Sequence, residues 1–119
     1  MLAGGLQNLR LLSLSHNQLV SLPSTVGSLR SLQVLDIAHN SLTCIPEDLA
    51  RALSSTLKVL IADHNRIGGC PTSLVQLTGL RELGLAHNAI TALPLGLHQA
   101  LPQLTTLRLE GNPVLGAPS

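Results

Sequence analysis

The chain has 119 residues, of which 45% are hydrophobic, and it contains no Phe, Tyr or Trp. This length allows one domain or a short repeat array, whose core must be filled by Leu, Val and Ile because aromatic rings are absent. Seven basic and six acidic residues give a formal charge of +1. The sequence therefore excludes modules that stack nucleic-acid bases on aromatic rings, and it gives no electrostatic case for binding DNA, RNA or an anionic membrane.

Neither a membrane span nor a targeting segment is predicted. Ser, His, Asn, Arg or Gln interrupts every leucine cluster, so no apolar run approaches the roughly 20 residues of a membrane-spanning helix. Residues 1–5 have neither a basic region nor an uninterrupted apolar stretch, so we predict no signal peptide. Two cysteines are too few for a disulfide framework, and no Asn-x-Ser/Thr acceptor is present. We therefore expect a cytoplasmic protein, unless the chain is part of something larger.

Asparagine recurs behind leucine-rich runs at intervals of 23 to 25 residues. The five copies are Asn17, Asn40, Asn65, Asn88 and Asn112. The apolar slots of the first copy are Leu9, Leu12, Leu14, Leu19 and Leu22, the last followed by Pro23. Similar slots recur in the other copies and place the repeats at about residues 6–28, 29–53, 54–76, 77–100 and 101–119. We expect residues 1–119 to form a single repeat domain with residues 1–5 as a short lead-in.

Each repeat is expected to contribute one short strand. Alternating positions such as Leu12 and Leu14, or Leu35 and Ile37, carry the period-two signal of a strand. A strand this short is not stable alone, so neighbouring repeats must stack to bury these side chains and to complete the backbone hydrogen bonds. Each recurring asparagine lies where the chain leaves its strand, and there its amide can satisfy backbone groups of adjacent turns.

The pattern L-x-x-L-x-L-x-x-N-x-L, followed by x-x-L-P, resembles the leucine-rich repeat family over about residues 6–115. The repeat length and the Leu-Pro step are most similar to the Ras-group type of intracellular leucine-rich repeat proteins. This resemblance implies an α/β fold: a right-handed solenoid of five repeats, with a parallel β-sheet on the concave face and short helical or irregular segments on the convex face.

The third repeat departs from the pattern at two apolar slots. Ala62 and Cys70 stand where leucine is expected. We expect Cys70 to be a small core residue, because it replaces an inward leucine. Cys44, in the neighbouring repeat, is one position out of register and is expected to point outward. A disulfide between the two is therefore not predicted, and both should remain thiols.

A helical turn is predicted ahead of this third repeat. Pro46 followed by Glu47 and Asp48 is typical of a helix start, because proline suits the first turn and acidic residues suit the positive end of the helix dipole. Two additional residues lie within residues 50–55. We therefore expect the turn near residues 47–53.

Side chains between the inward positions of each strand point away from the core, so the sheet presents a second face. Four apolar residues fall on this face, on strands expected about 4.8 Å apart: Leu11, Val34, Val59 and Ile61. β-branched residues also suit exposed strands, which leaves a purely structural explanation open. We nonetheless predict that these four residues make the apolar contacts of a docking surface for another protein.

Charged residues surround the predicted patch. Three basic residues border it on one side: Arg10, Lys58 and Arg81. Four residues on the same face are predicted to set the specificity for the partner: Asp36, Asp63, Glu82 and Arg108.

Histidine directly precedes four of the five asparagines, at His16, His39, His64 and His87. Stacked strands place these side chains in a line, whereas zinc needs three or four ligands that converge on one point. We therefore predict no metal site. A weak response to pH is expected instead, since closely spaced imidazoles resist being charged together.

Ser15, His39 and Asp63 fall on consecutive strands in the order of a nucleophilic triad. The sequence offers no oxyanion hole, no elbow turn and no enclosed pocket around them. We therefore predict no enzymatic activity and no cofactor.

The ends of the array lack the caps that solenoids normally carry. Five leucines at the two ends are therefore expected to be partly exposed: Leu6, Leu9, Leu12, Leu107 and Leu109. An uncapped array of this kind is expected to self-associate through its ends.

These patterns predict a protein–protein interaction module that binds a protein partner on its concave sheet face, with the role of a signalling scaffold. The resemblance to the Ras-group type implies a small GTPase or another signalling protein as the partner, and no residue identifies which. An alternative stays open, in which the chain is a fragment of a longer leucine-rich repeat protein. It would then serve as a structural or substrate-recognition arm of a multidomain protein.

Overall fold

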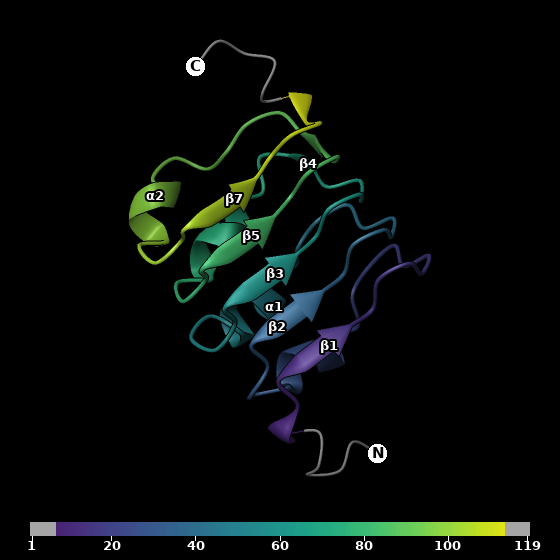
Figure 1. Ribbon diagram of the computed structural model, residues 1–119, viewed down its shortest axis with the longest axis vertical. Coiled ribbons are helices and arrows are strands. Elements are labelled where there is room, and N and C mark those ends of the chain that lie inside the picture. The colour runs from purple at the N-terminus through teal and green to yellow at the C-terminus, as the bar shows by residue number, and fades with distance from the viewer. Residues whose placement is uncertain (1–6, 114–119) are drawn as a thin grey trace.

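Five parallel strands stack in chain order in the computed structural model, which describes residues 7–113. They are β1 (Leu11–Ser13), β2 (Val34–Asp36), β3 (Val59–Ile61), β5 (Glu82–Gly84) and β7 (Thr106–Arg108). Figure 1 shows the strands side by side like the rungs of a ladder, in the order β1-β2-β3-β5-β7. The register is the one that the repeat predicts, since each strand is centred on the same leucine slot.

The centre of each strand points into the core. The central leucines of the three inner strands are buried, whereas Leu12 in β1 and Leu107 in β7 are only partly buried. The difference follows from stacking, because an inner strand has a neighbour on both sides and an outer strand has only one. Partial exposure at the two ends is thus confirmed for Leu9, Leu12, Leu107 and Leu109. Leu6 lies outside the described residues.

Short helical segments lie on the opposite side of the molecule from the sheet's exposed face (Figure 1). They are η2 (Ser24–Ser28), α1 (Glu47–Ala52), η3 (Thr72–Gln76) and α2 (Leu97–Ala100). The helix α1 confirms the turn predicted near residues 47–53. It starts after Pro46, with Glu47 and Asp48 in its first turn. A second, two-stranded sheet joins β4 (Gly68–Gly69) to β6 (Ala89–Ile90).

The recurring asparagines connect each repeat to the one before it. The Asn65 amide nitrogen donates to the Ile37 carbonyl of the previous repeat and to the Ala62 carbonyl of its own, each at 3.0 Å. Its Oδ1 accepts a hydrogen bond from the Leu42 backbone N–H at 3.0 Å. Asn40 bonds the preceding repeat in the same way, with Leu14 as acceptor and Leu19 as donor. The predicted role of these side chains is confirmed.

The expected place of Cys70 in the core is wrong, because its side chain is exposed. Gly69, directly before it, has a left-handed backbone with φ of 64°. A residue with a side chain rarely adopts this conformation, and here it turns Cys70 out of the stack while the following Pro71 is buried. Cys44 is exposed, as predicted, and both residues are free thiols.

None of the helices within residues 7–113 is both long enough and apolar enough to cross a membrane.

Candidate interaction surface

The four predicted apolar residues lie on three adjacent strands, on the face of the sheet that points away from the core. Leu11, Val34 and Val59 are direct partners in the strand register, and Ile61 lies at the end of β3 opposite Asp36. The Leu11 side chain is 59% exposed, and the other three residues are half-buried. We call these four residues the apolar patch. The inward slots of the same strands are already filled by leucine, so the core does not require these side chains.

Three of the four predicted charged residues bind one another. Arg108, in β7, donates through Nε and Nη2 to Oδ2 of Asp63, at 3.2 and 3.1 Å. Its Nη1 donates to Oε2 of Glu82, in β5, at 3.0 Å. Asp63 follows β3, so the guanidinium reaches across the one intervening strand, β5. We call Asp63, Glu82 and Arg108 the ion-pair cluster.

The hydrogen bond that Arg108 donates to Glu82, together with the neighbouring charge of Asp63, raises the pKa of Arg108, although partial burial opposes the shift. The guanidinium therefore stays charged, and the cluster forms a fixed polar border beside the apolar patch. Asp36 does not take part in it. The Oδ1 atom of Asp36 accepts a hydrogen bond from the Ala38 backbone N–H at 3.1 Å.

Gly84 makes the ion-pair cluster possible, a role that the repeat pattern alone does not predict. This residue lies in β5 between Asp63 and Arg108, and a side-chain carbon added to it would overlap both the guanidinium and the carboxylate. The sequence signal that points to this role is a glycine in an outward slot, opposite Ile61 on one side and Arg108 on the other.

The four predicted histidines form a stack of rings, which we call the histidine ladder. Neighbouring ring centroids are 4.2, 4.3 and 4.4 Å apart, and the rings are within 10° to 16° of parallel. All four have a left-handed backbone, with φ between 57° and 59°, which is uncommon for residues other than glycine. Gly111 takes the fifth position, where the His87 ring occupies the space of a side chain.

The position of His39 inside the ladder affects its pKa. Desolvation by its packed neighbours, followed by the charges of His16 and His64, lowers the pKa of His39, while Asp63 and Asp36 oppose the shift. The parallel rings do not converge on a point. Across the described part of the chain, no three His, Cys, Asp or Glu side chains are grouped so that they could hold a metal ion.

The three residues in triad order each have other partners. Ser15 exchanges a hydrogen bond with Ser13 at 3.2 Å, His39 is stacked between two rings, and Asp63 binds Arg108. The geometry therefore gives no proton relay from Ser15 through His39 to Asp63.

A family model for a leucine-rich repeat region matches residues 2–114. The chain belongs to the leucine-rich repeat family. The α/β solenoid of five stacked repeats predicted from the sequence is thereby confirmed, with its parallel sheet on one face and short helical segments on the other. No curated protein sequence matches this leucine-rich repeat chain.

Two solved leucine-rich repeat structures are similar to the chain. A leucine-rich repeat protein of Leptospira interrogans is 35% identical, with a TM-score of 0.77 over 86% of this chain and 25% of that one. TLR13, in its complex with the RNA ssRNA13, is 28% identical, with a TM-score of 0.80 over 90% of this chain and 15% of that one. The present chain thus spans about a quarter or less of each structure's length.

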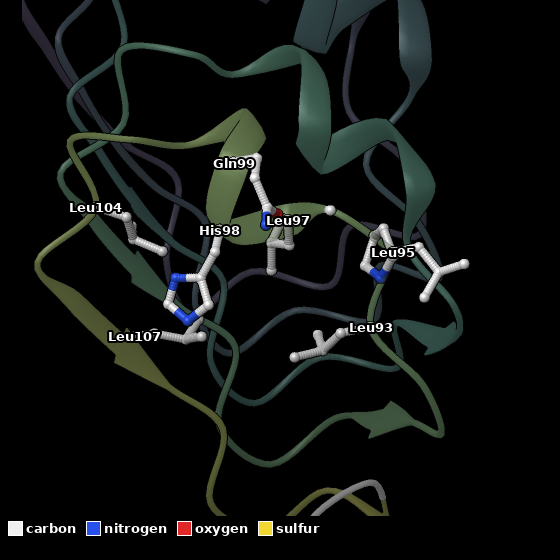
Figure 2. Close-up of a pocket in the computed structure, with 9 residues that line it drawn as sticks. Leu93, Leu95, Leu97, His98, Gln99, Leu104 and Leu107 are labelled. Atoms are coloured by element: carbon white, nitrogen blue, oxygen red, sulfur yellow. The ribbon is translucent and has the colours of Figure 1, made fainter.

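An apolar hollow of about 290 Å³ lies at the carboxyl-terminal end of this leucine-rich repeat stack. Figure 2 shows it between the α2 segment and β7, where Leu93, Leu97, Leu104 and Leu107 line it. Leu95, at its rim, is completely exposed. His98 is the only titratable side chain among the residues that line this hollow.

Proposed function

We propose that this leucine-rich repeat chain is a protein-interaction module that binds a protein partner on the outward face of its parallel sheet. The observation that carries the proposal is the apolar patch. Leu11 is 59% exposed and lies in register with Val34 and Val59, although the leucine slots behind them already fill the core. Burying such side chains against a partner releases water from apolar surface, which is the main driving force of association.

The charged residues of the face complete the proposed surface. The ion-pair cluster gives the partner a polar border whose groups are fixed in place before binding, and the Asp36 carboxylate stands beside Ile61 across the strands. A surface of this kind binds a partner without catalysing a reaction, so we propose a non-enzymatic module that needs no cofactor. The family membership supports the same class of function.

The finer role rests on the repeat type. The Leu-Pro step resembles that of the Ras-group proteins, so we propose a signalling scaffold in the cytoplasm with a small GTPase or another signalling protein as partner. The solved TLR13 structure contains an RNA. For this chain we propose a protein instead, because a charge of +1 and the absence of aromatic residues give RNA little to bind.

The test is affinity capture from lysate of the source cells with three chains: wild type, Val34→Glu with Val59→Glu, and Leu11→Glu. We expect a protein that the wild type retains and both variants lose. Val20→Glu is the matched control, because Val20 is 68% exposed and lies outside the sheet. Retention by all four chains would contradict the proposal.

Thermal unfolding of the same chains separates lost binding from lost folding. The double variant is expected to keep a cooperative melt, because its two positions are half-buried on the outward face. Loss of that melt would show that the core requires these valines. In that case the more exposed Leu11 decides whether the face binds, since its substitution cannot open the core.

A second candidate function is a segment of a longer leucine-rich repeat solenoid, serving as a structural or substrate-recognition arm of a multidomain protein. Hollows at both ends of the stack favour it. One is lined by Leu93, Leu104 and Leu107, and the other by Leu9 and Leu12 among others. Light scattering distinguishes the candidates: end-to-end association that grows with concentration supports the segment, and a monomer at all concentrations supports the separate module.

A further inference from the structure

Three basic residues lie along the edge at which the strands begin. Arg10, Lys58 and Arg81 directly precede β1, β3 and β5, so each is adjacent in sequence to an outward residue of its strand. We call them the basic edge. Their backbone carbonyls accept hydrogen bonds from the next repeat, which fixes their position along the sheet. The Lys58 ammonium lies beside Gly79, in the turn before β5.

The basic edge has no carboxylate partner within the described residues. The ion pairs found between residues 7 and 113 involve only Arg51 and Arg108 as cations. Gln33 and Thr105 stand in the same row and carry no charge. The three basic side chains therefore keep their full charge available to an incoming molecule.

The acidic residues next to the apolar patch do not lie on the basic edge, since Asp36 ends β2, Asp63 follows β3, and the Glu82 carboxylate is turned toward Arg108. Asp63 and Glu82 both bind the Arg108 guanidinium, and Oδ1 of Asp36 binds the Ala38 backbone N–H. Glu82 follows Arg81 directly, yet its Oε2 points to Arg108 at 3.0 Å. The charge next to the apolar patch is therefore divided: it is positive along the basic edge, where the strands begin, and negative at Asp36 and Asp63, where β2 and β3 end.

From this asymmetry we infer that the partner presents acidic side chains beside aliphatic ones, with its carboxylates against the basic edge and its aliphatic groups on the apolar patch. The inference rests on the proposed function and specifies its partner. Lys58 and Arg81 precede adjacent strands, about 4.8 Å apart, which is well within the screening distance of about 8 Å at physiological salt. Their charges therefore act together on an approaching carboxylate and speed the encounter.

The experiment selects a random peptide library, displayed on phage, against the folded full chain at low salt. We expect the enriched peptides to combine Asp or Glu with Leu, Ile or Val. Synthetic copies of the enriched peptides are then titrated by fluorescence anisotropy. We expect Lys58→Glu with Arg81→Glu to weaken binding about tenfold or more, and added salt to weaken binding to the wild type.

The matched control is Arg30→Glu with Arg51→Glu, which changes the net charge equally at exposed positions outside the sheet. We expect it to bind like the wild type. One contrary result is that the enriched peptides fail to bind Val34→Glu with Val59→Glu and yet bind Lys58→Glu with Arg81→Glu as tightly as the wild type. That result would overturn the acidic partner but would still support the proposed function. Peptides that bind both double variants as tightly as they bind the wild type would contradict the acidic partner and the proposed function alike. The absence of any enriched peptide would do the same.

Discussion

Gly84 determines at the residue scale how the charges of the sheet face are arranged. A glycine here leaves room for the Arg108 guanidinium to cross β5 and reach Asp63 at 3.1 Å. Without that crossing, Asp63 would present a free carboxylate to a partner. The absence of a side chain at Gly84 thus allows Arg108 and Asp63 to form an ion pair.

The variant Gly84→Ala is expected to displace the guanidinium and to lower the free energy of unfolding by roughly 0.5–1.5 kcal/mol through the lost hydrogen bonds. Thermal and urea unfolding measure the change. In Gly68→Ala, the control, the added carbon meets only ordinary contacts, so no loss is expected. The cost of Gly84→Ala should also disappear in an Arg108→Ala background, and a cost that persists there would contradict this role of Gly84.

The asparagines show how one polar side chain replaces missing strand pairing between repeats. Asn65 is buried and bonds backbone groups in two repeats, whereas Asn17 is exposed and bonds only Leu14 and Ser15 of its own repeat. We therefore expect Asn65 to contribute more than Asn17 to the free energy of unfolding. The reason is that Asn17 has no earlier repeat within the described residues to which it could bond.

Asn65→Ala is expected to lower the free energy of unfolding by about 1–3 kcal/mol for each buried backbone group left without a partner. Asn17→Ala is the matched control and should cost less than about 1 kcal/mol, because its partners are exposed to water. Chemical denaturation of the two variants tests the difference. Equal losses would show that the bonds between repeats contribute little.

At the scale of the elements, the histidine ladder behaves as one unit. Each ring packs within about 4.4 Å of its neighbour, so a proton added to one ring raises the cost of charging the next. The pKa of His39 is lowered from 6.5 by desolvation and by His16 and His64, against the opposing effect of Asp63 and Asp36.

The sign of the pH effect follows from this shift. Above pH 6.5 the imidazole is neutral in both states, so it does not change stability. As the pH falls through 6.5 toward the lowered pKa, the unfolded chain binds the proton more tightly, and the folded chain loses stability. Thermal unfolding of the wild type should therefore show that Tm decreases as the pH is lowered through this window.

His39→Asn should reduce that fall in Tm, and asparagine tolerates the left-handed backbone of this position. The control is His98→Asn, since His98 lies in α2 outside the ladder. A pH dependence that is unchanged in His39→Asn but reduced in His98→Asn would contradict the assignment.

The elements that the sequence predicts are those set by local repetition. The strands follow from alternating leucines, and α1 follows from Pro46 with Glu47 and Asp48 behind it. The position of Cys70 could not be predicted, because spacing alone does not reveal the left-handed turn at Gly69. The ion-pair cluster was missed for another reason: it joins repeats that are two strands apart and depends on Gly84 between them.

At the scale of the whole molecule, the chain is a stack in which each repeat contacts only its neighbours, so its stability is a sum of repeat and interface contributions. The inner repeats bury their leucines fully and the outer ones only in part. The stack also separates two faces: a side with short helical segments that closes the core, and a sheet side that carries the apolar patch. We propose that a partner binds on the sheet side.

The most direct test is methyl NMR of the chain with labelled Leu, Val and Ile, recorded with and without the captured partner. We predict that the methyl signals of Leu11, Val34, Val59 and Ile61 shift or broaden, while those of Val26 and Leu74, which η2 and η3 bury in the core, do not. Changes confined to Leu93, Leu95 and Leu107, at the carboxyl-terminal hollow, would contradict binding on the sheet side.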